Sequence, residues 1–287
     1  PGQTEFIVLE RGVSKSINVY YYENVELTAN SDEKIYNGEE QTVAGFTGAP
    51  DGSDFSAVNV GAKGTDAGTY RAEFPDGTVG TVDRTGKYIV TEVFNGALVI
   101  KPVTDKVTVT ITGNCMEETY NGKLQTVEGY NVSIDNPLYK EANFTFSGDA
   151  KAEGTDVKDS CYMGLNADQF SNMSNNFENV AFIVTDGKLT INPRPVTLVS
   201  DNLEKEYDGT PLTNGNEPLA TEKGWLEGQG ATYTFTGSQT IVGESGNTFD
   251  YAAKKDTNLD NYAITATPGK LTVTDRTTKF PVTVRAN

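Results

Sequence analysis

The residues of this chain that are suited to chemistry are mainly carboxylates, because its 287 residues include 40 Asp and Glu but no histidine. Without an imidazole the chain cannot assemble a Ser-His-Asp triad, a Cys-His pair or a histidine zinc site. Two cysteines are too few for a four-cysteine zinc site, and no phosphate loop of the form GxxxxGK[ST] occurs. A glycosidase needs two carboxylates across one cleft, and the sequence indicates no such cleft. We therefore expect no catalytic residues, no cofactor and no enzyme activity.

One acidic loop resembles the start of a calcium site. Asp256, Asn258 and Asp260 alternate in "DTNLDN", as the first ligands of an EF-hand loop do. The sixth position is Asn261 instead of glycine, and the twelfth is Thr267 instead of glutamate. We expect a solvated loop here, and a weak calcium contact outside EF-hand geometry is the alternative.

The single tryptophan is the candidate for ligand binding. Trp225 lies in the glycine-rich segment "EKGWLEGQG". An exposed indole in such a loop could stack on a sugar ring, whereas a buried indole would cover the core of its own domain. Of the two interpretations, the sequence favours the covering of the core.

The charge of the chain limits its partners. The formal net charge is −17, from 23 Lys and Arg against 40 Asp and Glu. This field repels phosphate backbones and anionic lipids, so we expect no nucleic-acid partner. No stretch approaches the ~18 apolar residues of a membrane span, so we expect no membrane insertion. The acidity favours solubility and a monomer.

Two phrases that recur with one period organise the chain. "EKIYNGEEQTVAGF" at 33–46 returns as "EETYNGKLQTVEGY" at 117–130 and as "EKEYDGTPLTNG" at 204–215. "NGALVIKP" at 95–102, "DGKLTINP" at 186–193 and "PGKLTVTD" at 268–275 keep step with them. This pattern predicts a tandem array of domains.

The period divides the chain into three repeats at 23–102, 103–193 and 194–275. Residues 1–22 are either the end of a preceding domain or additional N-terminal strands, and 276–287 resemble the opening strand of a further repeat. The junctions are short and contain proline, which fixes φ, so we expect an elongated rod. No secretory signal or sorting motif is visible, and we expect a signal and an anchor outside this segment.

The recurring tyrosine motifs have a structural interpretation. In each, the tyrosine packs while the next two residues form a turn, because Asn-Gly and Asp-Gly readily supply positive φ. The motifs are Tyr36-Asn37-Gly38, Tyr120-Asn121-Gly122 and Tyr207-Asp208-Gly209.

Alternation of apolar and polar residues predicts strands throughout. In "KVTVTITGN" at 106–114, Val107, Val109 and Ile111 share one face. The fold class is all-β, with each repeat a small Ig-like β-sandwich. The alternative is a β-grasp-like unit with one short helix, and "NADQF" at 166–170 is expected to form one helical turn capped by its asparagine.

The closing phrase of each repeat has the pattern of a β-hairpin. In "VAFIVTDGKLTINP", alternating runs flank Asp186-Gly187, which predicts a two-residue hairpin turn. Asn95-Gly96 and Pro268-Gly269 stand at the same place in the other repeats. Cys115 and Cys161 both lie in the second repeat, and since the other repeats lack cysteine, we predict no disulfide.

The opening "VTVTITGN", the "Y[ND]G" turn, the "GTD" turn at 64–66 and 154–156, and the closing "DGKLTINP" together resemble the MBG/YDG-type repeats of large bacterial surface proteins. The resemblance covers about residues 24–287. It implies a non-catalytic module at the bacterial cell surface, in adhesin-like or cell-wall-anchored proteins, and it brings no ligand-binding residues.

Two functions follow as expectations. The first is a stalk or spacer, or an adhesion module that contacts a host or matrix glycan or protein. The alternative is a carbohydrate-binding module appended to a secreted enzyme.

Overall fold

The computed structural model describes residues 2–10, 13–278 and 283–285, and in this part the chain is all-β, which confirms the predicted class. The helices among these residues are short 3₁₀ turns, and no helix there is long and apolar enough to cross a membrane. They are η1 (Glu141–Asn143), η2 (Val157–Asp159), η3 (Ala167–Gln169) and η4 (Leu259–Asn261). The turn η3 is the one predicted in "NADQF".

The chain divides into two compact units, and the second repeat contributes to both of them. Unit 1 contains Pro1–Thr110, Val132–Ser147 and Asp168–Ile183. Unit 2 contains Ile111–Asn131, Gly148–Ala167 and Val184–Asn287.

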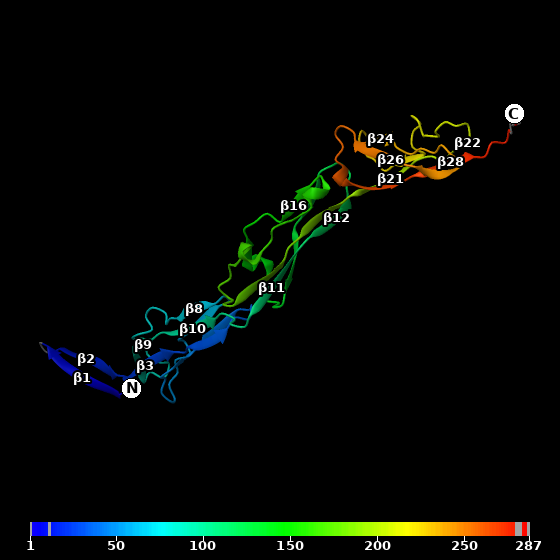
Figure 1. Cartoon of the computed structure of the whole chain (residues 1–287). Helices are drawn as coiled ribbons and strands as arrows, with labels where there is room; N and C mark the ends of the chain where they lie inside the picture. Colours follow the sequence, from blue (N-terminus) through cyan, green and yellow to red (C-terminus); the bar gives the residue numbers. More distant parts are fainter. Residues whose placement is uncertain (1, 11–12, 279–282, 286–287) are drawn as a thin grey trace. The chain divides into compact units, whose positions relative to one another are not determined.

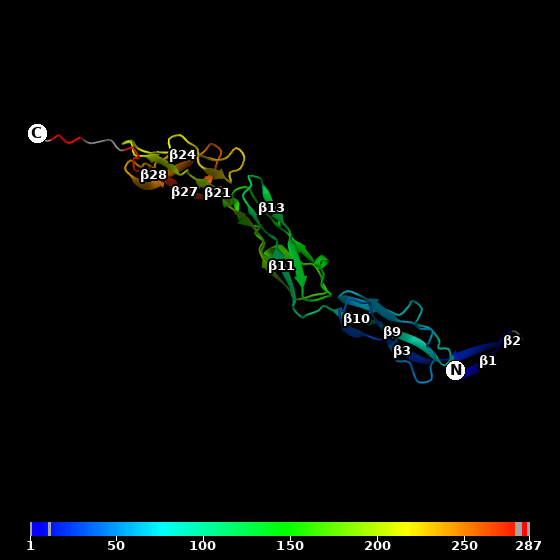
Figure 2. The same cartoon turned by 90° about the vertical axis from the view of Figure 1, so that its right-hand side faces the viewer.

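Repeat 1 lies within unit 1 and forms small sheets whose strands are seen side by side in Figures 1 and 2. Strand β3 lies between β6 and β9, β10 lies between β4 and β8, and β5 pairs with β7. The strands are β3 (Glu23–Ala29), β4 (Asp32–Ile35), β5 (Gln41–Ala44), β6 (Phe46–Thr47), β7 (Gly61–Gly64), β8 (Gly68–Ala72), β9 (Tyr88–Phe94) and β10 (Gly96–Lys101). Before them, β1 (Gly2–Glu10) and β2 (Val13–Tyr21) form an antiparallel hairpin in a sheet of their own.

Repeat 2 has the same order of strands. Strand β11 lies between β14 and β19, β20 lies between β12 and β17, and β13 pairs with β16 and β15 with β18. The strands are β11 (Val107–Gly113), β12 (Cys115–Thr119), β13 (Gln125–Glu128), β14 (Tyr130–Ile134), β15 (Phe144–Phe146), β16 (Lys151–Gly154), β17 (Cys161–Tyr162), β18 (Phe170–Asn172), β19 (Val180–Thr185) and β20 (Lys188–Asn192).

Repeat 3 lies within unit 2 and keeps the topology of the two three-stranded sheets. Strand β21 lies between β23 and β27, β28 lies between β22 and β25, and β24 pairs with β26. The strands are β21 (Arg194–Val199), β22 (Leu203–Glu206), β23 (Thr221–Lys223), β24 (Ala231–Phe235), β25 (Gly243–Asn247), β26 (Phe249–Ala253), β27 (Tyr262–Thr267) and β28 (Gly269–Thr274).

The opening strands supply the cores of these sandwich-like repeats. Val107, Val109 and Ile111 are all fully buried, as their alternation predicts. The opening strand of repeat 1 alternates in the same way, and Leu27 and its neighbours pack with a buried cluster around Phe55 and Phe74. Full burial of each such side chain contributes about 1.5–3 kcal/mol, so these strands account for much of the folding energy.

The predicted hairpin at the end of each repeat is wrong. Strands β9 and β10 belong to different sheets, as do β19 and β20, and β27 and β28. Each pair is one extended segment that passes from one sheet to the other. The opening pair does the same, so β3 runs parallel to β9 and β4 runs parallel to β10.

The glycine at this crossing allows a close approach of two backbones. Gly96, Gly187 and Gly269 do not have positive φ, so no hairpin turn forms there. A Cβ on Gly187 would lie 2.5 Å from the carbonyl oxygen of Asn114, and one on Gly96 would lie 2.3 Å from that of Asn30. Glycine is needed at these positions because the backbones of the opening and closing segments touch where the two segments cross.

The structure also locates the cysteines and the C-terminal segment. Cys115 and Cys161 are free and flank β20 on opposite sides, so two strand spacings, about 9.6 Å, separate them. This distance exceeds the ~7 Å that a disulfide allows between Cα atoms. Within the predicted opening strand at 276–287, residues 276–278 and 283–285 form no strand, and the others lie outside the described residues.

Candidate functional site at the repeat junctions

The three tyrosine motifs form the same turn. In each, the side-chain oxygen of the Asn or Asp accepts a hydrogen bond from the backbone N–H two residues later, at 2.9–3.0 Å, and the next residue is a glycine with φ between 72° and 84°. The pairs are Asn37 with Glu39, Asn121 with Lys123, and Asp208 with Thr210. This Asx turn is the geometry expected from the sequence.

The tyrosines of the first two motifs pack on an aromatic residue of the following repeat. In unit 1, the rings of Tyr36 and Phe177 meet edge to face with centroids 5.6 Å apart. In unit 2, Tyr120 and Tyr262 meet in the same way at 5.5 Å. Phe177 and Tyr262 are almost fully buried, so each forms the centre of a junction between two repeats.

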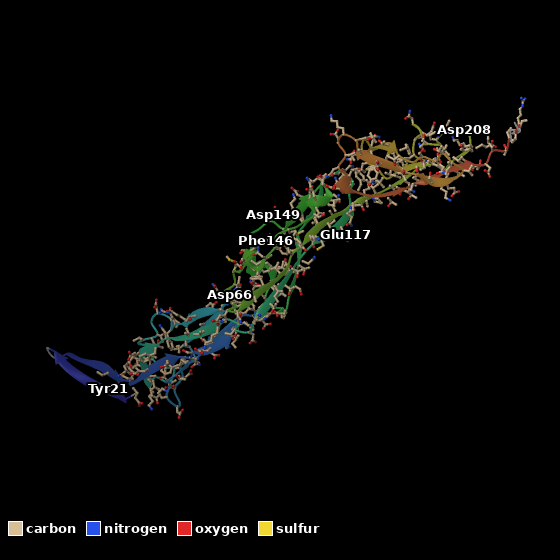
Figure 3. All side chains as sticks on the ribbon, in the orientation of Figure 1. Tyr21, Asp66, Glu117, Phe146, Asp149 and Asp208 are labelled. Atoms are coloured by element: carbon tan, nitrogen blue, oxygen red, sulfur yellow. The ribbon has the colours of Figure 1, made fainter. Side chains whose placement is uncertain are left out.

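A hydrogen-bonded Asp–Asn pair stands beside the first aromatic contact. Asp66, labelled in Figure 3, lies in the turn between β7 and β8. Asn176 Nδ2 donates to its Oδ1 at 2.8 Å, and the backbone N–H of Ala67 donates to Asn176 Oδ1 at 2.6 Å. The amide of Asn176 thus uses both of its polar atoms on one turn of repeat 1.

The same arrangement occurs at the second junction. Asn261 Nδ2 donates to Asp156 Oδ1 at 2.8 Å, and the backbone N–H of Val157 donates to Asn261 Oδ1 at 2.9 Å. Asn261 is 1% exposed, and both polar atoms of its side-chain amide have a partner within the protein. We call these contacts the first and the second Asp–Asn pair.

The turn glycines complete each junction. A Cβ on Gly38 would lie 3.1 Å from a methyl carbon of Leu138, and one on Gly122 would lie 3.0 Å from a methyl carbon of Leu226. Both leucines come from the following repeat. The turn of one repeat therefore fits against an apolar side chain of the next.

The sequence contained a signal for these junctions. The "GTD" turns recur visibly in the sequence, whereas their partners, Asn176-Phe177 and Asn261-Tyr262, lie in segments that the two tyrosine and closing motifs do not include. The paired residues are 110 and 105 positions apart along the chain. The signal was the recurrence of an Asn-aromatic dipeptide, three residues ahead of β19 in repeat 2 and at the start of β27 in repeat 3.

Trp225 belongs to the second junction. It is half-buried, and its ring lies edge to face against Tyr262 with centroids 4.6 Å apart. Its Nε1 lies 3.4 Å from the hydroxyl of Tyr233. Tyr262 also donates its hydroxyl to Gln229 Oε1 at 2.6 Å, and Gln229 Nε2 donates to the Tyr120 hydroxyl at 3.1 Å. The tryptophan thus supports the residue that contacts repeat 2.

The calcium candidates lie on an exposed loop that ends at the second Asp–Asn pair. Asn258 caps η4, because its Oδ1 accepts the N–H of Asp260 at 3.1 Å, while Asp256 has a φ of 66°. Across the part of the chain that the structure describes, no group of three or more His, Cys, Asp or Glu could hold a metal. The loop positions Asn261, which is the function that its geometry supports.

The N-terminal end of repeat 1 is closed differently. Tyr88 is the first residue of β9, as Tyr262 is of β27, but Lys87 precedes it instead of asparagine. Lys87 Nζ donates to the Tyr88 hydroxyl at 2.9 Å and lies 3.3 Å from Glu23, and these contacts raise the pKa of Lys87.

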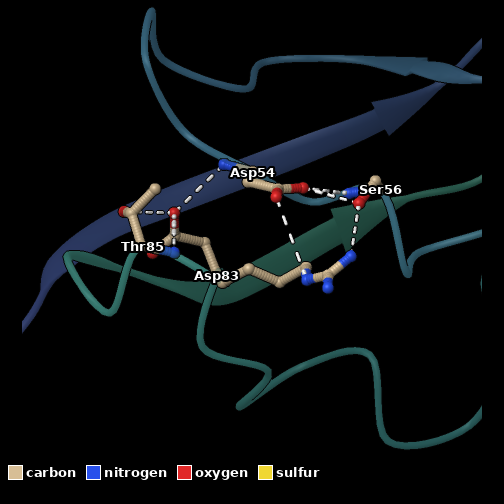
Figure 4. A network of polar contacts seen from close by, with 5 residues as sticks. Asp54, Ser56, Asp83 and Thr85 are labelled. Carbon is tan, nitrogen blue, oxygen red and sulfur yellow. Dashed lines mark hydrogen bonds and ion pairs between the residues drawn. The ribbon is translucent and has the colours of Figure 1, made fainter.

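A buried carboxylate organises the loops at this end (Figure 4). Asp83 accepts hydrogen bonds from the N–H groups of Asp54, Thr85, Lys87 and Tyr88 at 2.9–3.2 Å, and from the Thr85 hydroxyl at 2.5 Å. Burial alone would raise the pKa of Asp83, but these hydrogen bonds outweigh it and hold the pKa well below the usual range. Because its partners are all donors, this carboxylate is structural and does not present a cation site.

Comparisons with known proteins add little to this description. A scan against protein-family models found no match, and a search of curated proteins found none. Among solved structures, the crystal structure of the I9-I11 tandem from titin is similar at 11% sequence identity and a TM-score of 0.18, covering 95% of this chain and 100% of that chain. A likeness at this TM-score carries no argument about function.

Proposed function

We propose that this chain is a non-catalytic tandem-repeat segment of a bacterial cell-surface protein, where it serves as a stalk or spacer or as an adhesion module. The observation that carries the proposal is the construction of one junction twice. Both junctions use an Asp–Asn pair, an aromatic pair and a glycine turn against a leucine. A spacer needs each domain to contact the next one in a fixed way, and a junction that is built twice from the same kinds of residue provides such a contact.

The chemistry of the junctions supports a holding role. Each Asn amide joins a carboxylate and a backbone N–H at once, so rotation about the connection would break both bonds. The connection itself is short, because β20 ends at Asn192 and β21 begins at Arg194. A short connection containing proline leaves little freedom between neighbouring repeats.

The location at a bacterial surface rests on the resemblance to MBG/YDG-type repeats. The strong negative charge agrees with an extracellular segment that avoids nucleic acid and self-association. A host or matrix glycan or protein would be the partner if the module also adheres.

Small-angle X-ray scattering tests the spacer. A compact globule of this length has a radius of gyration of about 19 Å, and a spacer should clearly exceed this value. Asn176→Asp and Asn261→Asp, introduced together, should broaden the distribution of interatomic distances, because they disrupt both junctions. A compact radius for the unmodified chain would contradict the proposal.

The alternative, a carbohydrate-binding module of a secreted enzyme, is tested on a glycan array. The half-buried position of Trp225 against Tyr262 disfavours stacking on a sugar. Specific glycan binding that is lost in Trp225→Ala, with the fold kept, would favour the alternative. The matched control is Tyr251→Ala, which removes an exposed aromatic from the same repeat.

A further inference from the structure

The C-terminal end of repeat 3 has the same strand pairing as the end of repeat 1 that contacts the next repeat, but the side chains of its turn are different. In the ladders, Gly68 faces Ile100 and Gly243 faces Val273, and these pairs are equivalent in the two repeats. The residues before the two glycines therefore correspond. Ile241 and Val242 stand where repeat 1 has Asp66 and Ala67.

No residue that the structure describes covers this end of repeat 3. Tyr207 is 40% exposed, whereas its counterpart Tyr120 is 4% exposed under the next repeat. Ile241 and Val242 are 70% and 48% exposed. A Cβ on Gly209 would meet nothing within 4 Å, although the equivalent glycines of the first two repeats each contact a leucine.

We propose that Tyr207, Ile241 and Val242 form a docking surface for a further β-repeat of this fold. In that repeat, an apolar residue would precede the aromatic residue that packs on Tyr207. The two internal junctions show what such a surface binds: an aromatic ring on the tyrosine, and a second residue on the turn beside it. At repeat 3 the turn offers no carboxylate, so an asparagine amide would be buried there without its acceptor. An apolar side chain would pack against Ile241 and would not bury a polar atom without a hydrogen-bond partner.

The proposal goes beyond the spacer function, because it concerns which repeat can follow repeat 3 wherever the protein is displayed. It also excludes the N-terminal end of a second copy as the occupant. The aromatic at that end, Tyr88, is buried beneath its own loops and is preceded by Lys87.

The test appends a repeat of known docking chemistry. Residues 1–275 are followed by a second copy of residues 194–275 in place of 276–287, since Asp275 is equivalent to the Pro193 that precedes repeat 3. A first form has an unmodified copy, and a second form carries Asn261→Val in the copy only. A third form keeps the unmodified copy but carries Ile241→Asp and Val242→Ala in the original repeat 3. These substitutions introduce the residue types that repeat 1 has at Asp66 and Ala67.

The readouts are chemical labelling of Tyr207 and hydrogen exchange of the segment around Val242. In the second and third forms we expect Tyr207 to be protected as Tyr120 is. In the first form we expect about tenfold less protection, because the amide lacks an acceptor. Far-UV circular dichroism checks that the added repeat folds.

Three results would overturn the proposal. If the first and second forms are protected equally, the surface does not select an apolar partner. If Tyr207 is as accessible in all three forms as in the original chain, this end does not dock a repeat. Protection of Tyr207 that rises with the concentration of the original chain would instead identify a second copy as the occupant, and would also refute the proposal.

Discussion

Asn176→Asp should weaken the first junction strongly. The substitution replaces the Nδ2 group that lies 2.8 Å from Asp66 Oδ1 with a second carboxylate oxygen. The lost bond to a charged acceptor contributes about 1.5–3 kcal/mol. Two like charges about 4 Å apart repel by about 4 kcal/mol at an effective dielectric constant of 20, and less here because Asp66 is solvent-exposed. We expect a total loss of about 2–4 kcal/mol in local stability.

The reciprocal exchange separates this pair from general structural damage. Asp66→Asn alone should cost only about 0.5–1 kcal/mol, because the new side-chain oxygen can still accept from Asn176. In the double variant with Asn176→Asp, the amide placed at position 66 can donate to the carboxylate placed at position 176. The Ala67 N–H keeps an acceptor as well. The double variant should therefore recover most of the stability that Asn176→Asp loses.

Hydrogen exchange of the Ala67 amide is the assay, because it reports local opening in a protein of several repeats. Since about 1.4 kcal/mol corresponds to a factor of ten, protection should fall roughly 30-fold or more in Asn176→Asp. Asn261→Asp is the matched control, and it should affect the Val157 amide while Ala67 keeps its protection. A double variant no better protected than Asn176→Asp would refute the role of the pair.

Three further predictions follow from burial, close approach and charge. Tyr120→Ala should cost about 3 kcal/mol in thermal unfolding, while Tyr207→Ala should cost less than about 1 kcal/mol because this tyrosine is exposed; equal losses would contradict the junction role. Gly187→Ala should lower the melting temperature, since its Cβ would lie 2.5 Å from a backbone oxygen, whereas Gly246→Ala, with 3.4 Å of room, should be tolerated. The folded pKa of Asp83 lies below its ordinary value of 3.8, so the unfolded state binds the proton first as the pH falls. Its contribution should be complete above about pH 4 and should decline below it, and acid titration of Asp83→Asn should show a smaller decline.

Local pattern was sufficient to predict the opening strand of repeat 2 and the turns of the tyrosine motifs. The alternation in β11 corresponds to three fully buried side chains, because one face of a pleated strand meets the core. The turns of the tyrosine motifs followed from the conformational freedom of glycine, and Gly38 and Gly122 have the positive φ that such turns need. These features depend on neighbours within a few residues.

The closing hairpin was wrong because two different structures share one local pattern. Alternating runs on either side of Asp186-Gly187 fit a tight turn, but they also fit one long segment that changes sheets. What decides between them is the contact of Gly187 with the backbone at Asn114, more than 70 residues earlier in the chain. A single sequence does not reveal that contact.

The Asp–Asn pairs escaped prediction for a similar reason. Asp66 in a "GTD" turn and Asn176 in a polar loop are each ordinary turn residues. Their role arises only when the fold brings them together across 110 positions. The evidence in the sequence was that the "GTD" turn and the Asn-aromatic dipeptide both recur in the next repeat. Their contact becomes clear only once the parallel pairing of the strands is known.

The parallel pairing of opening and closing strands has a mechanical consequence. In repeat 1 the chain enters at Glu23, beside Tyr88, and leaves at Lys101, beside Ile35. Tension applied to the two ends therefore pulls the β3–β4 segment along the β9–β10 segment in the opposite direction. Such a load shears the hydrogen bonds of both ladders together, whereas a terminal hairpin would let them open one at a time. Repeat 3 has the same arrangement between Arg194 and Thr274. The hydrogen bonds along the full length of its parallel strands would therefore resist extension together.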